Sequence, residues 1–291
     1  KKQVISQNDD FFNIVVIPNG NTSEQASVVK IVATAEKLLS EYDLHFGGPP
    51  YLVGIVSSLV RADAMFLVRI GLVMMVIILL ASLRSVAGVF MVLFVIILSL
   101  IGMMGSMGWI RGLTGSERFV FSIMNTSMPI ILMTIANSDS VHFLTKFFKK
   151  LRITGDKAKA IEQSIDSLML PIFLTSLTTA AAFLSLVFAP IEYMTGYGVS
   201  IAIGISWAWI LSTTLLPSLI MLKDWPLNSR SIRKPGLLER IVDKFGSKII
   251  KFPRSILIGG LLLVAVGIHG IKLVTTEVNM FSFFEKGNKI R

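Results

Sequence analysis

Hydrophobic residues are concentrated in six long runs that short polar segments separate. A helix needs roughly 20 apolar residues to cross the hydrocarbon core of a bilayer, and most of the runs reach that length. A soluble chain of this size could not bury six such helices with so little polar surface. The pattern therefore predicts a polytopic α-helical membrane protein with six transmembrane helices, over residues 66–83, 86–110, 121–145, 168–189, 194–222 and 255–271.

The first 65 residues are different, because polar residues and turn signals interrupt shorter apolar stretches. Residues 11–17 and 43–46 have the pattern of strands. Apolar residues at three-to-four spacing over 28–38 predict a helix, and a second helix is predicted over 51–64, after the break at Gly47-Gly48-Pro49-Pro50. The order β-α-β-α is about half of a ferredoxin-like α+β module. Because half a module needs a partner to complete its sheet, we expect the chain to be a piece of a longer protein.

Composition supports the membrane prediction. Hydrophobic residues make up 53% of the 291 residues, charged residues 16%, and the mean hydropathy is +0.72. Typical globular domains carry about 25% charged residues. This composition excludes a disordered chain.

The sequence offers little for enzymatic chemistry. The absence of Cys excludes disulfides, a thiol nucleophile and cysteine metal ligands, and the three His residues have no metal-binding spacing. No Gly-x-Ser-x-Gly turn and no phosphate-binding Gly-x4-Gly-Lys-Ser/Thr loop is present. We therefore expect no enzyme, no metal and no cofactor, and any transport would draw on an ion gradient.

The positive charges indicate how the chain is oriented. Sixteen Lys and Arg residues lie in loops 84–85, 146–167 and 223–254, against two in loops 111–120 and 190–193. Because cytoplasmic loops carry the excess of Lys and Arg, the first three loops are predicted to be cytoplasmic and the two ends of the chain extracytoplasmic. Most of the net charge of +10 is thereby explained by orientation, which argues against nucleic acid as a partner.

Two cytoplasmic segments have an apolar face beside basic residues. Residues 155–167 are predicted to form a short surface helix at the inner leaflet, and residues 237–251 a second amphipathic helix within the linker 223–254.

Asp139 is the only Asp or Glu within the six apolar runs. A carboxyl group inside a membrane is costly, so such a residue is by default a functional candidate. His142 follows three residues later and shares its helix face. A structural role is the alternative: a Ser or Thr of a neighbouring helix could hold Asp139, or the residue could lie near the membrane edge, seven residues before Lys146. Asn137 points about 200° away and is expected to serve packing.

Other polar or special residues within the runs predict structural roles. The run from Thr175 to Ala182 is rich in small and hydroxyl residues, which favours close helix packing and hydrogen bonds between helices. Pro129 and Pro217 are expected to kink their helices.

Several motifs together resemble the resistance–nodulation–division (RND) superfamily, with the MMPL-like, hydrophobe-exporter branch as the nearest group and sterol-sensing-domain proteins as relatives. The resemblance covers nearly the whole chain. It rests on the turns Phe46-Gly47-Gly48-Pro49 and Leu83-Arg84-Ser85-Val86-Ala87-Gly88, on Asn125, Pro129 and Ser138-Asp139-Ser140-Val141-His142-Phe143, and on Pro171 to Phe183.

This resemblance implies a map of the chain. Residues 1–65 would be the C-terminal part of the first extracytoplasmic porter domain, and the six runs would be spans two to seven of twelve. Residues 66–222 would hold spans two to six, residues 255–275 span seven, and residues 276–291 the start of the second porter domain.

The resemblance also implies a role for Asp139, because the family uses an Asp of the fourth span in a proton relay. Ser140 stands where the family usually has Tyr, and Asn137-Ser138 stands where it has Gly and a hydrophobic residue. These departures put a Tyr-assisted relay in doubt and make His142 the second candidate relay residue.

The function implied is proton-motive-force-driven export of hydrophobic or amphiphilic molecules, with lipids as the expected class. Two alternatives of the same fold remain: a lipid- or sterol-sensing, receptor-like protein that does not pump, and an accessory subunit in protein secretion. The expected partners are protons, membrane lipids and the substrate, with a homo-oligomer left open. The expected location is the inner, or plasma, membrane.

Overall fold

The computed structural model describes residues 25–42, 49–121, 123–229, 232 and 237–274. The chain forms two units, one of residues 1–62 with 275–291 and one of residues 63–274. All regular elements of the described residues are helices, and no strand occurs among them. The predicted strands 11–17 and 43–46 lie outside the described residues, so the ferredoxin-like module stays a prediction.

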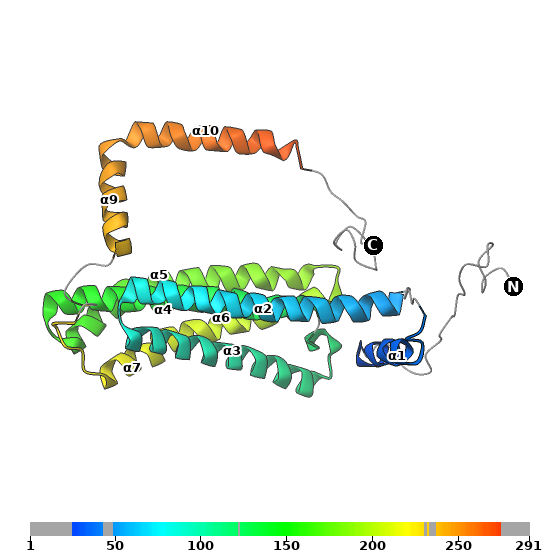
Figure 1. The fold of residues 1–291 in the computed structure, drawn as a ribbon. Helices are drawn as coiled ribbons and strands as arrows, with labels where there is room; N and C mark the ends of the chain where they lie inside the picture. Colours follow the sequence, from blue (N-terminus) through cyan, green and yellow to red (C-terminus); the bar gives the residue numbers. More distant parts are fainter. Residues whose placement is uncertain (1–24, 43–48, 122, 230–231, 233–236, 275–291) are drawn as a thin grey trace. The chain divides into compact units, whose positions relative to one another are not determined.

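The described part of the first unit consists of helix α1 (Gln25–Leu38) and the start of α2 (Pro49–Leu83). Helix α1 confirms the helix expected over 28–38. Helix α2 differs from expectation, because the predicted domain helix 51–64 and the first predicted span form one uninterrupted helix of 35 residues (Figure 1). No Gly or Pro separates the two segments between residues 55 and 70, so nothing in the sequence stops the helix there.

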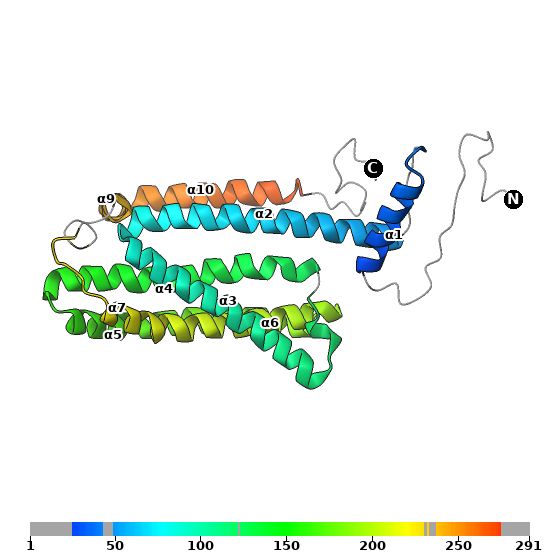
Figure 2. The same ribbon diagram turned by 60° about the horizontal axis from the view of Figure 1, so that its bottom comes forward.

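Four helices form the body of the second unit: α3 (Val86–Thr114), α4 (Met128–Thr154), α5 (Lys157–Leu184) and α6 (Glu192–Thr213). Helices α4 and α6 contact each other, and each also contacts α3 and α5. Figures 1 and 2 show α4, α5 and α6 side by side. The short helix α7 (Leu215–Leu222) continues from α6 and touches α3 and α5.

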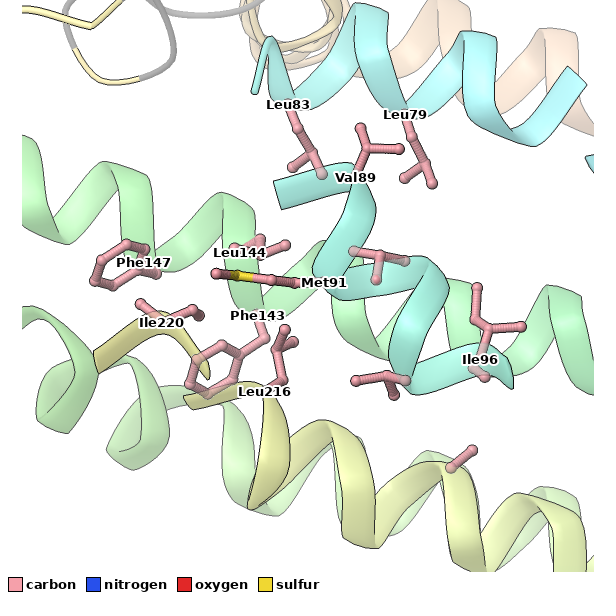
Figure 3. Packing of buried hydrophobic residues seen from close by; sticks show 14 of the residues in the cluster. Leu79, Leu83, Val89, Met91, Ile96, Phe143, Leu144, Phe147, Leu216 and Ile220 are labelled. Atoms are coloured by element: carbon pink, nitrogen blue, oxygen red, sulfur yellow. The ribbon is translucent and has the colours of Figure 1, made fainter. Parts of the chain in front are cut away.

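The core lies where α2, α3, α4, α6 and α7 meet. Figure 3 shows Leu79 and Leu83 of α2 beside Val89 of α3, and Leu216 of α7 beside Phe143 of α4. Each of these five side chains is at most 4% exposed. Apolar side chains that are buried almost completely include Ile96, Met103, Met128, Leu132, Leu144, Phe147, Ile201, Ile205 and Ile220.

Tight turns and glycines set how closely the helices pack. Ser85 starts α3 by accepting a hydrogen bond from the Gly88 N–H at 3.1 Å. In α6, a Cβ at Gly196 would collide with the Arg118 carbonyl, and a Cβ at Gly198 would collide with the Phe183 carbonyl. These two positions therefore require glycine because backbone lies where a side chain would stand.

Five stretches of the described helices are long and apolar enough to span a membrane: Ala62–Leu83, Val86–Thr114, Lys157–Phe188, Tyr193–Leu222 and Pro253–Ile271. They match five of the six predicted spans. Many of their large apolar side chains are exposed, as expected for helices that meet lipid or further protein.

The remaining predicted span, 121–145, begins later than expected, as α4 at Met128, and is less apolar than the others. Its mean hydropathy is lowered by three polar residues, Asn137, Asp139 and His142. Helix α4 also has eleven buried residues and packs against α3, α5 and α6. A helix enclosed in this way presents little surface to lipid and can carry polar residues.

Two local expectations were wrong. Residues 155–167, predicted as a short surface helix, form no separate element, because α5 begins at Lys157 and continues to Leu184. Pro129 lies in the first turn of α4, where proline does not kink a helix. The interruption expected at Pro217 is present: α6 ends at Thr213, four residues before it, and α7 begins at Leu215 within the same span, Tyr193–Leu222. The missing proline N–H leaves the Thr213 carbonyl without its i+4 donor.

Helices α9 (Leu237–Lys251) and α10 (Pro253–Ile271) follow the bundle in sequence. Helix α9 has the bounds predicted for the second amphipathic helix, and α10 matches the last predicted span. No residue of α10 is buried among the described residues. The lipid contact expected for α9 stays a prediction.

Candidate functional site

A tight turn places α4 and α5 antiparallel to each other. Gly155 has φ 63° and donates its N–H to the Leu151 carbonyl, which ends α4. Asp156 then caps α5 by accepting hydrogen bonds from the N–H groups of Ala158 (2.8 Å) and Lys159 (3.3 Å). A left-handed glycine followed by an Asp cap is a local sequence signal for this reversal.

Asp139 lies on the face of α4 that meets α5. Its side chain is buried, with 6% of the residue exposed. The Ser176 hydroxyl of α5 donates a hydrogen bond to Asp139 Oδ2 over 3.4 Å, which is near the upper limit for such a bond. No Lys or Arg forms an ion pair with Asp139 within the described residues. Burying an ionised carboxyl group without a nearby cation costs free energy. The ionised form of Asp139 is therefore unfavourable in this position.

One wall of a pocket of about 390 Å³ is formed by the same face of α4. Its polar lining residues come from both helices, and its apolar ones are Ile135, Leu168, Pro171 and Ile172. The polar residues are Ser138, Asp139 and His142 of α4, with Thr175, Ser176 and Thr179 of α5.

The two predicted relay residues thus line one pocket, but they differ in access. Asp139 is buried, whereas His142 is exposed. No hydrogen bond joins the two side chains in the part of the chain that the structure describes. Their shared wall confirms that both residues lie on one helix face, while the relay role stays a prediction.

The threonines of α5 give this pocket a defined polarity. Thr175 donates its hydroxyl hydrogen to the Ile172 carbonyl (2.9 Å), and Thr179 donates to the Thr175 carbonyl (2.6 Å). With these hydrogens used within α5, the threonine oxygens can only accept hydrogen bonds from anything in the pocket. These two threonines therefore offer hydrogen-bond acceptors to a group in the pocket.

Asn137 and Ser140 are not among the residues that line the pocket. Asn137 Oδ1 and Ser140 Oγ are buried without a hydrogen-bond partner among the described residues. The expectation that Asn137 points away from Asp139 agrees with this arrangement.

Sequence reasoning did not single out Ser176. The hydroxyl-rich run 175–182 predicts hydrogen bonds between helices, and Ser176 makes one, but the run does not show which member reaches Asp139. That depends on how far α5 is shifted along α4, which the packed helices determine.

The start of the linker 223–254 packs against the end of the bundle where α4 ends and α5 begins. Trp225 packs edge-on against Phe147 and Phe148 of α4, with ring centroids 5.8 and 5.3 Å away. Lys157, at the start of α5, donates to the carbonyls of Met221 (2.7 Å) and Lys223 (3.0 Å). The segment that leaves α7 is therefore attached to both helices of the site.

Among the described residues, no group of three His, Asp or Glu side chains could hold a metal ion together.

Comparison with known proteins agrees with a membrane protein of this type. The model of the MMPL family matches residues 1–241. A protein of Methanocaldococcus jannaschii that is named as a membrane protein is 26% identical over 116 residues, which are 40% of this chain. The match spans 30% of that relative's length.

Proposed function

Since the chain belongs to the MMPL family of the RND type, we propose that this multi-pass membrane protein works as a secondary transporter. In this proposal it exports hydrophobic or amphiphilic molecules, with lipids as the main class, and the proton-motive force drives it. It acts without a cofactor and is not an enzyme. Its location is the inner, or plasma, membrane, with the basic loops 146–167 and 223–254 in the cytoplasm.

The burial of Asp139 is the observation that carries this proposal. The acid sits in a helix enclosed by three others, with one long hydrogen bond and no cationic partner among the described residues. A carboxyl group in such surroundings suits alternation between a protonated, neutral state and an ionised state. Buried polar side-chain atoms normally have at least one hydrogen-bond partner, and Asp139 has a single long one among the described residues.

The geometry suggests how a proton couples to movement. The ionised carboxylate accepts the Ser176 hydrogen bond and so favours α4 and α5 close together. Protonation removes the charge and weakens this bond, which allows the helices to shift. A proton that crosses the membrane contributes about 2.3 kcal/mol per 100 mV, enough to bias two states that differ by a few kcal/mol.

His142 is proposed to deliver the proton. It is exposed and lines the pocket one helical turn from Asp139. Its imidazole nitrogens can accept and donate a proton. The family pattern adds that a further relay partner belongs to the second half of the protein, beyond this chain.

The test is export by the full-length protein in proteoliposomes under an imposed proton gradient. Asp139→Asn keeps the shape of the side chain but cannot ionise. We expect it to reduce gradient-driven export of a fluorescent lipid at least tenfold. Asp224→Asn is the matched control, because Asp224 is fully exposed, lies outside the pocket and makes a surface ion pair with Lys157 (3.6 Å) that contributes little to stability; it should export like the wild type.

The result also separates the alternatives. Normal export by Asp139→Asn would refute the relay role of Asp139. A wild-type protein that binds lipid but moves none when the gradient is applied would favour the sensing, receptor-like alternative.

A further inference from the structure

A second pocket, of about 440 Å³, lies between α5 and α6 and shares no lining residue with the Asp139 pocket. Its volume is within the usual range for a small-molecule site. The lining consists of Ile165, Asp166, Met169, Leu170 and Phe173 of α5, together with Trp209 of α6.

The lining changes from polar to apolar along α5. Asp166 is its only charged residue, and Met169, Leu170 and Phe173 follow at helical spacing on the same side. These three side chains are 38–63% exposed. An apolar surface with a charge at one end fits an amphiphile whose headgroup lies at Asp166 and whose chain lies along the three apolar residues.

The negative charge of Asp166 favours a positively charged headgroup. Asp166 is exposed and forms no ion pair among the described residues. Glu162, one turn earlier, adds negative charge. Both acids attract a cation and repel an anionic lipid headgroup.

An aromatic pair lines the apolar part of the pocket. The rings of Phe173 and Trp209 lie 5.2 Å apart, with 56° between their planes. Phe173 is seven residues after Asp166, about 10 Å along the helix axis. The pair therefore lies beside the aliphatic chain of the ligand, away from its headgroup.

The place of the pocket along α5 agrees with a membrane ligand. Asp166 lies nine residues after Lys157, about 14 Å along the helix axis, and the apolar part of α5 starts at Leu168. The acid thus marks the transition from the basic end of the helix to its membrane-spanning part.

We propose that this pocket binds the ammonium headgroup of a membrane amphiphile through Asp166, with Phe173 and Trp209 lining the part that takes its aliphatic chain. The ligand class is a primary amine that carries an aliphatic chain, either as a single-chain amine or as phosphatidylethanolamine. This site does not depend on Asp139 or on transport.

Binding can be measured by fluorescence quenching in phosphatidylcholine nanodiscs that hold the full-length protein. The probe is dodecylamine with a bromine at the chain end, and the Trp209→Phe variant gives the signal of the other tryptophans. We expect dodecylamine to bind at least fivefold more tightly than the equally brominated dodecanol. Asp166→Asn should remove this difference, whereas Glu162→Gln, which changes an acid outside the lining, should retain most of it.

A second arm distinguishes the two sources of the amine. Brominated phosphatidylethanolamine that quenches Trp209 more than brominated phosphatidylcholine identifies the bilayer lipid as a ligand; equal quenching by the two lipids limits the site to single-chain amines. Equal binding of dodecylamine and dodecanol, or an amine preference that survives in Asp166→Asn, would overturn the proposal. Because Asp166 is exposed, the variant should fold, which gel filtration of the purified protein checks.

Discussion

A single hydroxyl group holds the proposed proton carrier in place. Ser176→Ala removes the only hydrogen bond that the Asp139 carboxylate accepts from the described residues. Because the bond is long, we expect a loss of about 1 kcal/mol, or roughly fivefold in transport rate. Initial rates of export in proteoliposomes measure this effect. Ser167→Ala is the control on the same helix, since Ser167 bonds to the Gln163 carbonyl and lies outside the pocket; an equal loss in both variants would contradict a specific role for Ser176.

The individual residues of the site differ in how far the sequence predicts them. Asp139 stands out because acids are absent from the other apolar runs, and His142 follows from helical spacing. Ser176 could not be distinguished from Thr175, Thr178 or Thr179, because all four are hydroxyl residues of one helix. Only the register between α4 and α5 decides which hydroxyl reaches the acid.

Helix α6 depends on close backbone contact with its neighbours. In Gly198→Ala the new methyl group would meet the Phe183 carbonyl and the Leu186 side chain, so helices must separate. We expect a loss of about 1–3 kcal/mol in stability, seen as a lower melting temperature in detergent. Gly105→Ala is the matched control in α3, where nothing lies within 4 Å of the added Cβ.

The control substitution, Gly105→Ala, is itself expected to change stability in a defined direction. Alanine is favoured over glycine inside a helix by up to about 1 kcal/mol, so Gly105→Ala should be neutral or slightly stabilising. Equal melting temperatures for Gly198→Ala and the wild type would show that the close approach at Gly198 does not limit stability.

At the level of elements, the sequence predicts most helices and fails at their ends. Hydropathy alone finds five spans because their surfaces are apolar. It cannot show that residues 157–167 continue into α5, since their charges resemble those of a surface helix and the buried contacts of Ala160, Ile161 and Ser164 are tertiary. The same holds for α4, whose polar residues are tolerated because other helices surround it.

The whole molecule is expected to sit in the membrane with its basic loops in the cytoplasm. The chain has no cysteine, so single cysteines can report on which side a residue lies. The substitution Glu117→Cys tests the short connection after α3, and Ser247→Cys tests α9; both positions are exposed. Because the bias of Lys and Arg places these segments on opposite sides, a membrane-impermeant maleimide added to intact cells should label only the first variant.

Phe94→Cys completes this experiment as a control, because Phe94 is an exposed apolar residue in the middle of α3 and should resist the polar reagent before and after lysis. Permeabilised cells should add labelling of Ser247→Cys alone. Labelling of Ser247→Cys in intact cells, with protection of Glu117→Cys, would invert the orientation. The proposed direction of export would then fail with it, since the basic loops would lie outside the cell.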